Sequence, residues 1–172
     1  MSAKNDERNR MVTITVRNIV ESDIVWIEKL LFDGARSKHF GSTVGNQAHQ
    51  MLKEVIAKKQ LEFLILRDGK QQPRLRGVKI FIADANGVPA SFLMCAEDYG
   101  QVELHLAATK KEYQRLGCFG VLIKYALKEY QSIEKKYARC YRKSTWGLDG
   151  LIKYNFKITK DGNPLVLVYR ND

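Results

Sequence analysis

Two glycines, Gly117 and Gly120, lie at the start of a strongly periodic helical segment and could bring its first turn against an anionic ligand. Glycine allows close approach of the backbone because it has no side chain to interpose. The first amide N–H groups of a helix have no partner within the helix, so they can bind a phosphate. Lys110, Lys111 and Arg115 add positive charge just before this helix. Because helix caps also use glycine, the pattern permits a phosphate site or a plain cap.

The histidines and cysteines are spaced in ways that favour packing over metal or disulfide chemistry. His39 and His49 have no carboxylate or thiolate nearby at a ligand spacing, which predicts surface or packing roles and no metal site. Cys95, Cys118 and Cys140 are scattered and form no CxxC pair, so they predict a reducing, cytoplasmic compartment. A thiol at a helix start can act as a nucleophile, but for Cys118 we favour packing.

Strands and helices alternate along the chain in an order that predicts a mixed α+β fold. Alternating or short apolar runs predict strands over 12–16, 61–66, 78–83, 90–96, 102–108, 137–143, 156–159 and 165–169. Apolar spacings of three and four predict helices that begin near Ser22 and Asn46, and two more over 119–130 and 146–154. The Asn86-Gly87 pair is a hairpin signal. We expect three layers, with a mostly antiparallel sheet of about seven strands flanked by about four helices.

Size and charge narrow the function classes. The 172 residues fit a single domain, which we expect over 12–172 after a flexible tail over 1–11. We expect neither a secretory signal nor a membrane span, because no apolar run is long enough. There are 29 Lys and Arg against 19 Asp and Glu, a formal net charge of +10. This balance favours nucleic acid, an acidic protein or a phosphate-rich ligand; a generally basic surface without a dedicated partner is the alternative.

The segment 114–120 resembles motif A of the GNAT superfamily, the acyl-CoA N-acyltransferases. That motif has Gln or Arg, two residues, Gly, one residue and then Gly or Ala. Gln114, Gly117 and Phe119 stand at these positions, and Gly120 follows at once. Phe119 departs from the motif, because the family has a small residue there; its side chain either reshapes the loop or points into the core.

The likeness covers 12–169. It includes the first strand and helix, a short helix that ends at Asn155-Phe156, and a final hairpin. One strand, 61–66, is surplus to the family pattern. The fold implied is therefore GNAT-like, with a V-shaped opening between the parallel strands 102–108 and 137–143.

The resemblance implies an acetyl-CoA site in this opening. Backbone groups of Leu106, Ala107 and Ala108 would bind the pantetheine arm. Gln114 belongs to the same set, and the pyrophosphate would lie on the amides of Arg115, Leu116, Gly117, Cys118, Phe119 and Gly120. No metal is implied.

The general base implied by the resemblance is a Glu. Many relatives use a Tyr of the short helix as the acid, but Leu151 stands at that position and Tyr154 leaves the helix in another direction. The histone-acetyltransferase branch lacks this Tyr and uses a Glu on the motif A strand, where Glu103 falls. His105 shares a face of a regular strand with Glu103, so it could orient the base. A solvated Glu103 and a packed His105 are the alternatives.

The expected function is transfer of the acetyl group from acetyl-CoA to a primary amine by direct attack. The acceptor is left open among a small molecule, a peptide or protein, and an aminoacyl-tRNA, to which the basic charge would be suited. Trp146, Tyr137 and Tyr141 could line the acceptor site or pack in the core. We expect a monomer or a homodimer. The alternative function is a non-catalytic GNAT-fold protein that binds CoA or nucleic acid.

Overall fold

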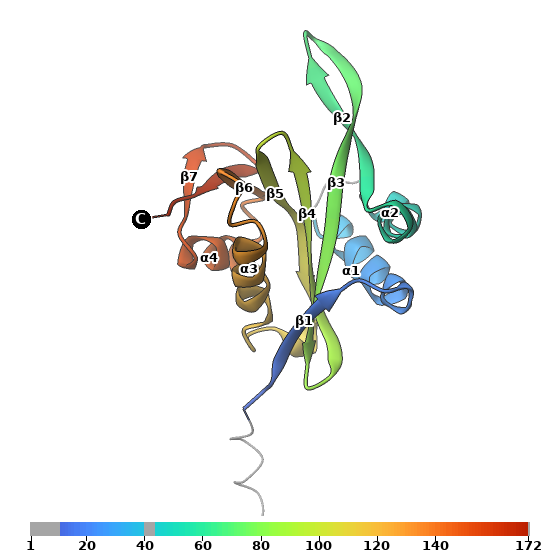
Figure 1. Cartoon of the computed structure of the whole chain (residues 1–172). Helices are drawn as coiled ribbons and strands as arrows, with labels where there is room; N and C mark the ends of the chain where they lie inside the picture. The colour runs from blue at the N-terminus through green and yellow to red at the C-terminus, as the bar shows by residue number, and fades with distance from the viewer. Residues whose placement is uncertain (1–10, 40–43, 172) are drawn as a thin grey trace, which may run out of the picture.

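The computed structural model describes residues 11–39 and 44–171, which form one mixed sheet with helices on both faces (Figure 1). Its strands are β1 (Ile14–Asn18), β2 (Gln60–Arg67), β3 (Lys70–Ala85), β4 (Val88–Asp98), β5 (Gln101–Thr109), β6 (Lys135–Cys140), β7 (Phe156–Lys160) and β8 (Leu165–Tyr169). The α-helices of the described ranges are α1 (Ile24–Arg36), α2 (Val44–Lys58), α3 (Cys118–Glu129) and α4 (Thr145–Lys153). The predicted α+β class is confirmed, with eight strands in place of about seven.

The sheet runs β1-β3-β4-β5-β6-β8-β7, and β2 also pairs with β3. Every pair is antiparallel except β5 with β6. The surplus strand is β2: it pairs with the first half of β3, whereas β1 pairs with the second half. Together β2 and the start of β3 form a hairpin that projects beyond the rest of the sheet (Figure 1).

Two predicted strand bounds differ most from the structure. β3 begins at Lys70, not at residue 78, because its polar first half pairs with β2. β6 ends at Cys140 and not at residue 143. Cys140 pairs with Leu165 of β8. The next residue of the partner strand would be Pro164, which has no N–H to donate to a ladder. The strand therefore stops where its neighbour can no longer pair.

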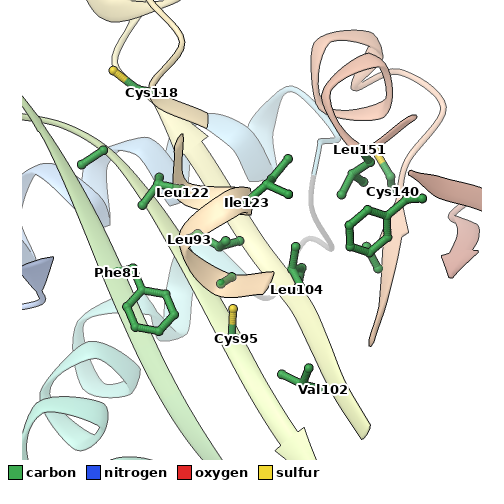
Figure 2. Packing of buried hydrophobic residues seen from close by; sticks show 14 of the residues in the cluster. Phe81, Leu93, Cys95, Val102, Leu104, Cys118, Leu122, Ile123, Cys140 and Leu151 are labelled. Atoms are coloured by element: carbon green, nitrogen blue, oxygen red, sulfur yellow. The ribbon is translucent and has the colours of Figure 1, made fainter. Parts of the chain in front are cut away.

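Two hydrophobic cores lie on opposite faces of the sheet. On one face α3 buries a stripe that includes Leu122 and Ile123 over Leu93 and Cys95 of β4 (Figure 2). On the other face α1 and α2 bury Ile27, Leu31, Ala48 and Leu52 against Ile80, Ile82, Phe92 and Met94. These stripes follow the three-and-four spacing predicted from the sequence. Both faces are covered, so the strands are held rigidly and can position a site at the point where two of them part.

Two expectations concern the ends of the fold. The predicted tail over 1–11 lies, apart from Met11, outside the described residues. No helix in the described part of the chain is long and apolar enough to cross a membrane.

Candidate active site

A cleft of about 530 Å³ opens between β5 and β6. The two strands pair in parallel only over four residues each, Gln101 to Leu104 with Lys135 to Ala138. Beyond Leu104, β5 continues to pair with β4 on one edge, while its other edge lines the cleft. The backbone groups of that edge are therefore free for a ligand. The volume lies within the usual range of small-molecule sites.

A β-bulge places His105 in the cleft wall. Cys95 of β4 faces Leu104 and Met94 faces Leu106, so His105 between them has no partner residue. This bulge breaks the regular alternation on which the shared face of Glu103 and His105 was predicted. The two side chains meet nevertheless: Nδ1 of His105 lies 2.5 Å from Oε1 of Glu103.

Glu103 is 1% exposed and is held by cations on its other oxygen. Nη2 of Arg139 donates to Oε2 at 2.9 Å, and Nη1 of Arg76 lies 3.8 Å from the same atom. Burial by itself would raise the pKa of Glu103. The hydrogen bond and charge of His105, with those of Arg139, outweigh burial and lower this pKa to about 2. Glu103 is therefore ionised at neutral pH and is a weak proton acceptor.

The foot of the β2–β3 hairpin fixes the imidazole. The ring of Phe63 packs edge-on against His105, with centroids 5.3 Å apart. The guanidinium of Arg76 lies over the Phe63 ring, 4.8 Å from its centroid, and donates to the carbonyl oxygens of Ala96 and Glu97. Nε2 of His105 has no hydrogen-bond partner among the described residues, so it is free to accept a proton.

The N-terminus of α3 lies beside the cleft. Gly117 caps the helix with φ of 89°, a left-handed conformation that suits glycine. The first helical hydrogen bond runs from the amide of Val121 to the carbonyl of Gly117, which leaves the amides of residues 118–120 without helical partners. A Cβ on Gly117 would meet nothing within 4 Å. The space beside Gly117 is therefore open.

The predicted ligand-binding side chains of 114–120 have distinct surroundings. Gln114 lines the cleft and donates to the carbonyl of Thr109 at 3.4 Å. Phe119 is half-buried, lines the cleft and packs edge-on against Trp146, with centroids 5.0 Å apart. Cys118 lies in the α3 core (Figure 2), where burial raises the pKa of its thiol, so it is poorly suited to nucleophilic attack. Arg115 and Leu116 are exposed.

Gly120 has a packing role that the motif did not predict. A Cβ at Gly120 would lie 2.5 Å from the hydroxyl oxygen of Tyr154 and 3.1 Å from its ring. Tyr154 therefore packs between α3 and α4 and is not a lining residue of the cleft. Leu151 does line the cleft and is buried, so an apolar side chain lies where the resemblance had implied an acid.

Gly120→Ala is expected to lower the free energy of unfolding by about 1–3 kcal/mol, the usual cost of overpacking, because α3 and α4 must move apart. Urea denaturation measures it. Tyr154→Phe removes the atom that clashes most, so the double variant G120A/Y154F should recover part of the loss. If the loss of unfolding free energy in the double variant equals the sum of the losses in the two single variants, then the two side chains do not contact each other.

Several residues far apart in the chain also line the cleft, among them Tyr141 and Trp146 of the three aromatic residues considered for the acceptor site. His39 contacts Ser144 across 2.5 Å from Nδ1 to Oγ, although the two are 105 residues apart. Tyr141, Trp146 and Arg139 are further lining residues, whereas Tyr137 is not. Arg76 and Arg139 reach Glu103 from other strands, so only the sheet order could have revealed them. In the described ranges, no cluster of three or more His, Cys, Asp or Glu could hold a metal ion.

Known structures resemble this fold over nearly its whole length. No family model matches the sequence, and no curated protein does either. The PaiA N-acetyltransferase of Thermoplasma acidophilum, solved with coenzyme A, has a TM-score of 0.66 at 13% identity, covering 92% of this chain and 99% of its own. A GNAT-family acetyltransferase of Staphylococcus aureus has a TM-score of 0.65 at 8% identity, covering 91% and 98%.

The Escherichia coli N-acetyltransferase that acts on the alanine of ribosomal protein S18 has a TM-score of 0.58 at 12% identity, covering 91% of each chain. At such low identities the likeness concerns the fold. This chain therefore has the fold of the GNAT N-acetyltransferases.

Proposed function

We propose that this protein is an acetyl-CoA-dependent N-acetyltransferase that acts on a primary amine by direct transfer. The observation that carries the proposal is the cleft formed where the parallel strands β5 and β6 part, with a free backbone edge along one wall. The N-terminus of α3, whose first amides have no helical partner, lies beside it, and the Glu103–His105 pair lies in its wall. The structural likeness to a CoA-bound N-acetyltransferase supports the same reading.

Acetyl-CoA fits the groups that the chain presents. The backbone of residues 106–108 would hydrogen-bond the pantetheine arm along the free edge of β5. The amides of 118–120, with the exposed Lys111 and Arg115, would hold the pyrophosphate. Residues 110–172 contain 14 of the 29 Lys and Arg but only 6 of the 19 Asp and Glu. The C-terminal part of the chain, which includes this segment, thus holds most of the net positive charge.

His105 acts as the base and Glu103 positions it, which reverses the roles expected from the sequence. The Nδ1–H of His105 donates to Glu103, so Nε2 carries the lone pair. The buried carboxylate fixes this tautomer and stabilises the imidazolium that forms. Glu103 itself is a poor acceptor because its pKa is about 2.

The reaction moves the acetyl group from sulfur to nitrogen and removes two protons from the acceptor ammonium. Nε2 of His105 takes one proton from the acceptor ammonium, and the neutral amine attacks the thioester carbon. The C–N bond forms and the C–S bond breaks, which releases CoA as a thiolate. The thiolate gains a proton from Tyr141, the single phenol among the described lining residues, and the second nitrogen proton restores the Tyr141 phenol. The products are the N-acetyl amine and CoA, with one proton passed through His105 to water.

Acetyl-CoA at about 100 times its dissociation constant is expected to add about 2.7 kcal/mol to the free energy of unfolding. For a chain of this size that raises Tm by about 5–10 °C. Thermal melting with acetyl-CoA and with CoA measures the shift. Arg115→Glu should reduce it, because the charge near the α3 amides is reversed. Lys53→Glu, an exposed position on α2, is the matched control and should leave the shift unchanged.

A screen of primary amines with a thiol-release readout completes the test. No Tm shift with either ligand would overturn the proposed function. A shift with CoA but no thiol release with any amine would favour the non-catalytic CoA-binding alternative. Binding of RNA that weakens steeply with salt, without a CoA effect, would favour a nucleic-acid role.

Other expectations stay predictions. They are a single domain over 12–172, a cytoplasmic location, a monomer or homodimer, and a special likeness to the histone-acetyltransferase branch. That last likeness rests on Glu103, to which we assign positioning instead of proton abstraction.

A further inference from the structure

Arg139 is the one Lys or Arg among the described residues that line the cleft. Its side chain is 50% exposed. One nitrogen, Nη2, donates to Glu103, and no other hydrogen-bond partner exists for this guanidinium among the described residues. An Arg side chain has five N–H donors in a planar fork. Most of the donors of Arg139 are therefore free at the cleft.

Arg76 shows that the free donors of Arg139 are not needed to compensate Glu103. Arg76 is 5% exposed, lies 3.8 Å from the same carboxylate oxygen, and spends its remaining nitrogens on the carbonyls of Ala96 and Glu97. His105 holds the second oxygen of Glu103. All three guanidinium nitrogens of Arg76 thus have partners within the protein, whereas the side chain of Arg139 is half-exposed and lines the cleft.

Arg139 also lies close to the proposed base. Both groups hydrogen-bond to one carboxylate, His105 on Oε1 and Arg139 on Oε2. An amine bound at Nε2 of His105 would therefore lie in the same part of the cleft as this guanidinium. In an α-amino acid the carboxylate is bonded to the carbon that bears the amine. The planar fork of an Arg matches a carboxylate in shape and charge.

We infer that the acceptor is a primary amine with a carboxylate next to its nitrogen, as in a free α-amino acid, and that Arg139 binds this carboxylate. The inference rests on the proposed function and names its substrate class. It disfavours peptide N-termini and aminoacyl esters, in which that carboxylate is blocked. The apolar lining residues Leu30, Trp146 and Pro164 suit an acceptor with an apolar side chain.

The test compares each of the 20 standard amino acids with its own carboxamide, in the presence of acetyl-CoA and with thiol release as the readout. The wild-type protein should prefer the best amino acid over its carboxamide about 10- to 100-fold in kcat/KM, the value of a charge-assisted hydrogen bond. Arg139→Gln should abolish this preference, and Arg139→Lys should keep part of it. Because a change that acted through Glu103 would slow both acceptors equally, the ratio isolates the contact with the carboxylate.

A binding measurement without turnover gives a second readout. Calorimetric titration of the CoA-bound protein with the best amino acid should show binding that Arg139→Gln loses. Arg142→Gln is the matched control, because Arg142 is an exposed Arg that pairs with Asp161 and does not line the cleft. Turnover of other amines without preference for a carboxylate, or an equal ratio in wild type and Arg139→Gln, would overturn the inference alone. Absence of CoA binding would overturn the proposed function beneath it.

Discussion

Replacement of His105 by glutamine is expected to lower kcat about 10²–10⁴-fold, the usual contribution of a general base, while the affinity for acetyl-CoA stays unchanged. Glutamine can still donate to Glu103 but has no lone pair of suitable basicity to take the ammonium proton. Steady-state kinetics with the best amine from the screen measure the loss.

Two further variants separate the base from the residue that positions it. His105→Ala should regain activity when imidazole is added, because a free imidazole can occupy the vacated space beside Glu103. Glu103→Gln should not be rescued, since its own imidazole is still present but is no longer stabilised as an imidazolium. His49→Gln, which alters a histidine paired with Glu28 on an exposed surface, controls for the loss of a histidine elsewhere.

The opposite pattern would restore Glu103 as the base. In that case His105→Gln would keep more than about a tenth of the wild-type kcat, and Glu103→Gln would lose nearly all of it. The two assignments thus predict different orders of activity for the same pair of variants.

Local patterns predicted the elements well where one period dominates. The stripe of α3, with Leu122 and Ile123, has a clear helical spacing, and the predicted helix lies within one residue of the observed start and end. The first half of β3 was missed because Gln71, Gln72 and Pro73 hide any alternation. This half of β3 is a strand because it pairs with β2. A local pattern of apolar and polar residues does not show which strands pair.

The site could be predicted only where its members are close in the chain. Glu103 and His105 are two residues apart, so their contact was expected, although the bulge that supports it was not. Arg76 and Arg139 reach Glu103 from β3 and β6, and the sheet order alone brings them there. These contacts between distant residues change the chemistry of Glu103, because they lower the pKa of the expected base to about 2. The sequence could predict that Glu103 and His105 lie together, but residues far along the chain determine the environment of Glu103.

Glu103→Gln is expected to destabilise the fold by about 3–5 kcal/mol at pH 7, as removal of one partner from a buried ion pair does. Arg76 would be left 5% exposed with its charge uncompensated by Glu103. The wild-type protein should also lose stability in acid through this residue. Its pKa is about 2 in the folded protein and 4.5 without the fold, so the contribution is fully present above about pH 4.5 and is lost as the pH falls through about 2.

The size of this acid effect is about 3 kcal/mol, from a pKa difference worth about 1.4 kcal/mol per unit. Urea denaturation of the wild type and of Glu103→Gln between about pH 2 and pH 7 measures this effect. The difference between the two stability curves isolates the contribution of Glu103 from that of Asp23. Burial raises the pKa of Asp23, but its contacts with Arg17 outweigh burial and lower it. The difference should shrink steadily toward acid. Asp149→Asn, at an exposed position on α4, should follow the wild-type curve throughout. A difference that is constant with pH would mean that Glu103 has the same pKa in the folded and the unfolded protein, and both the ion-pair cluster and the positioning role assigned to it would then be wrong.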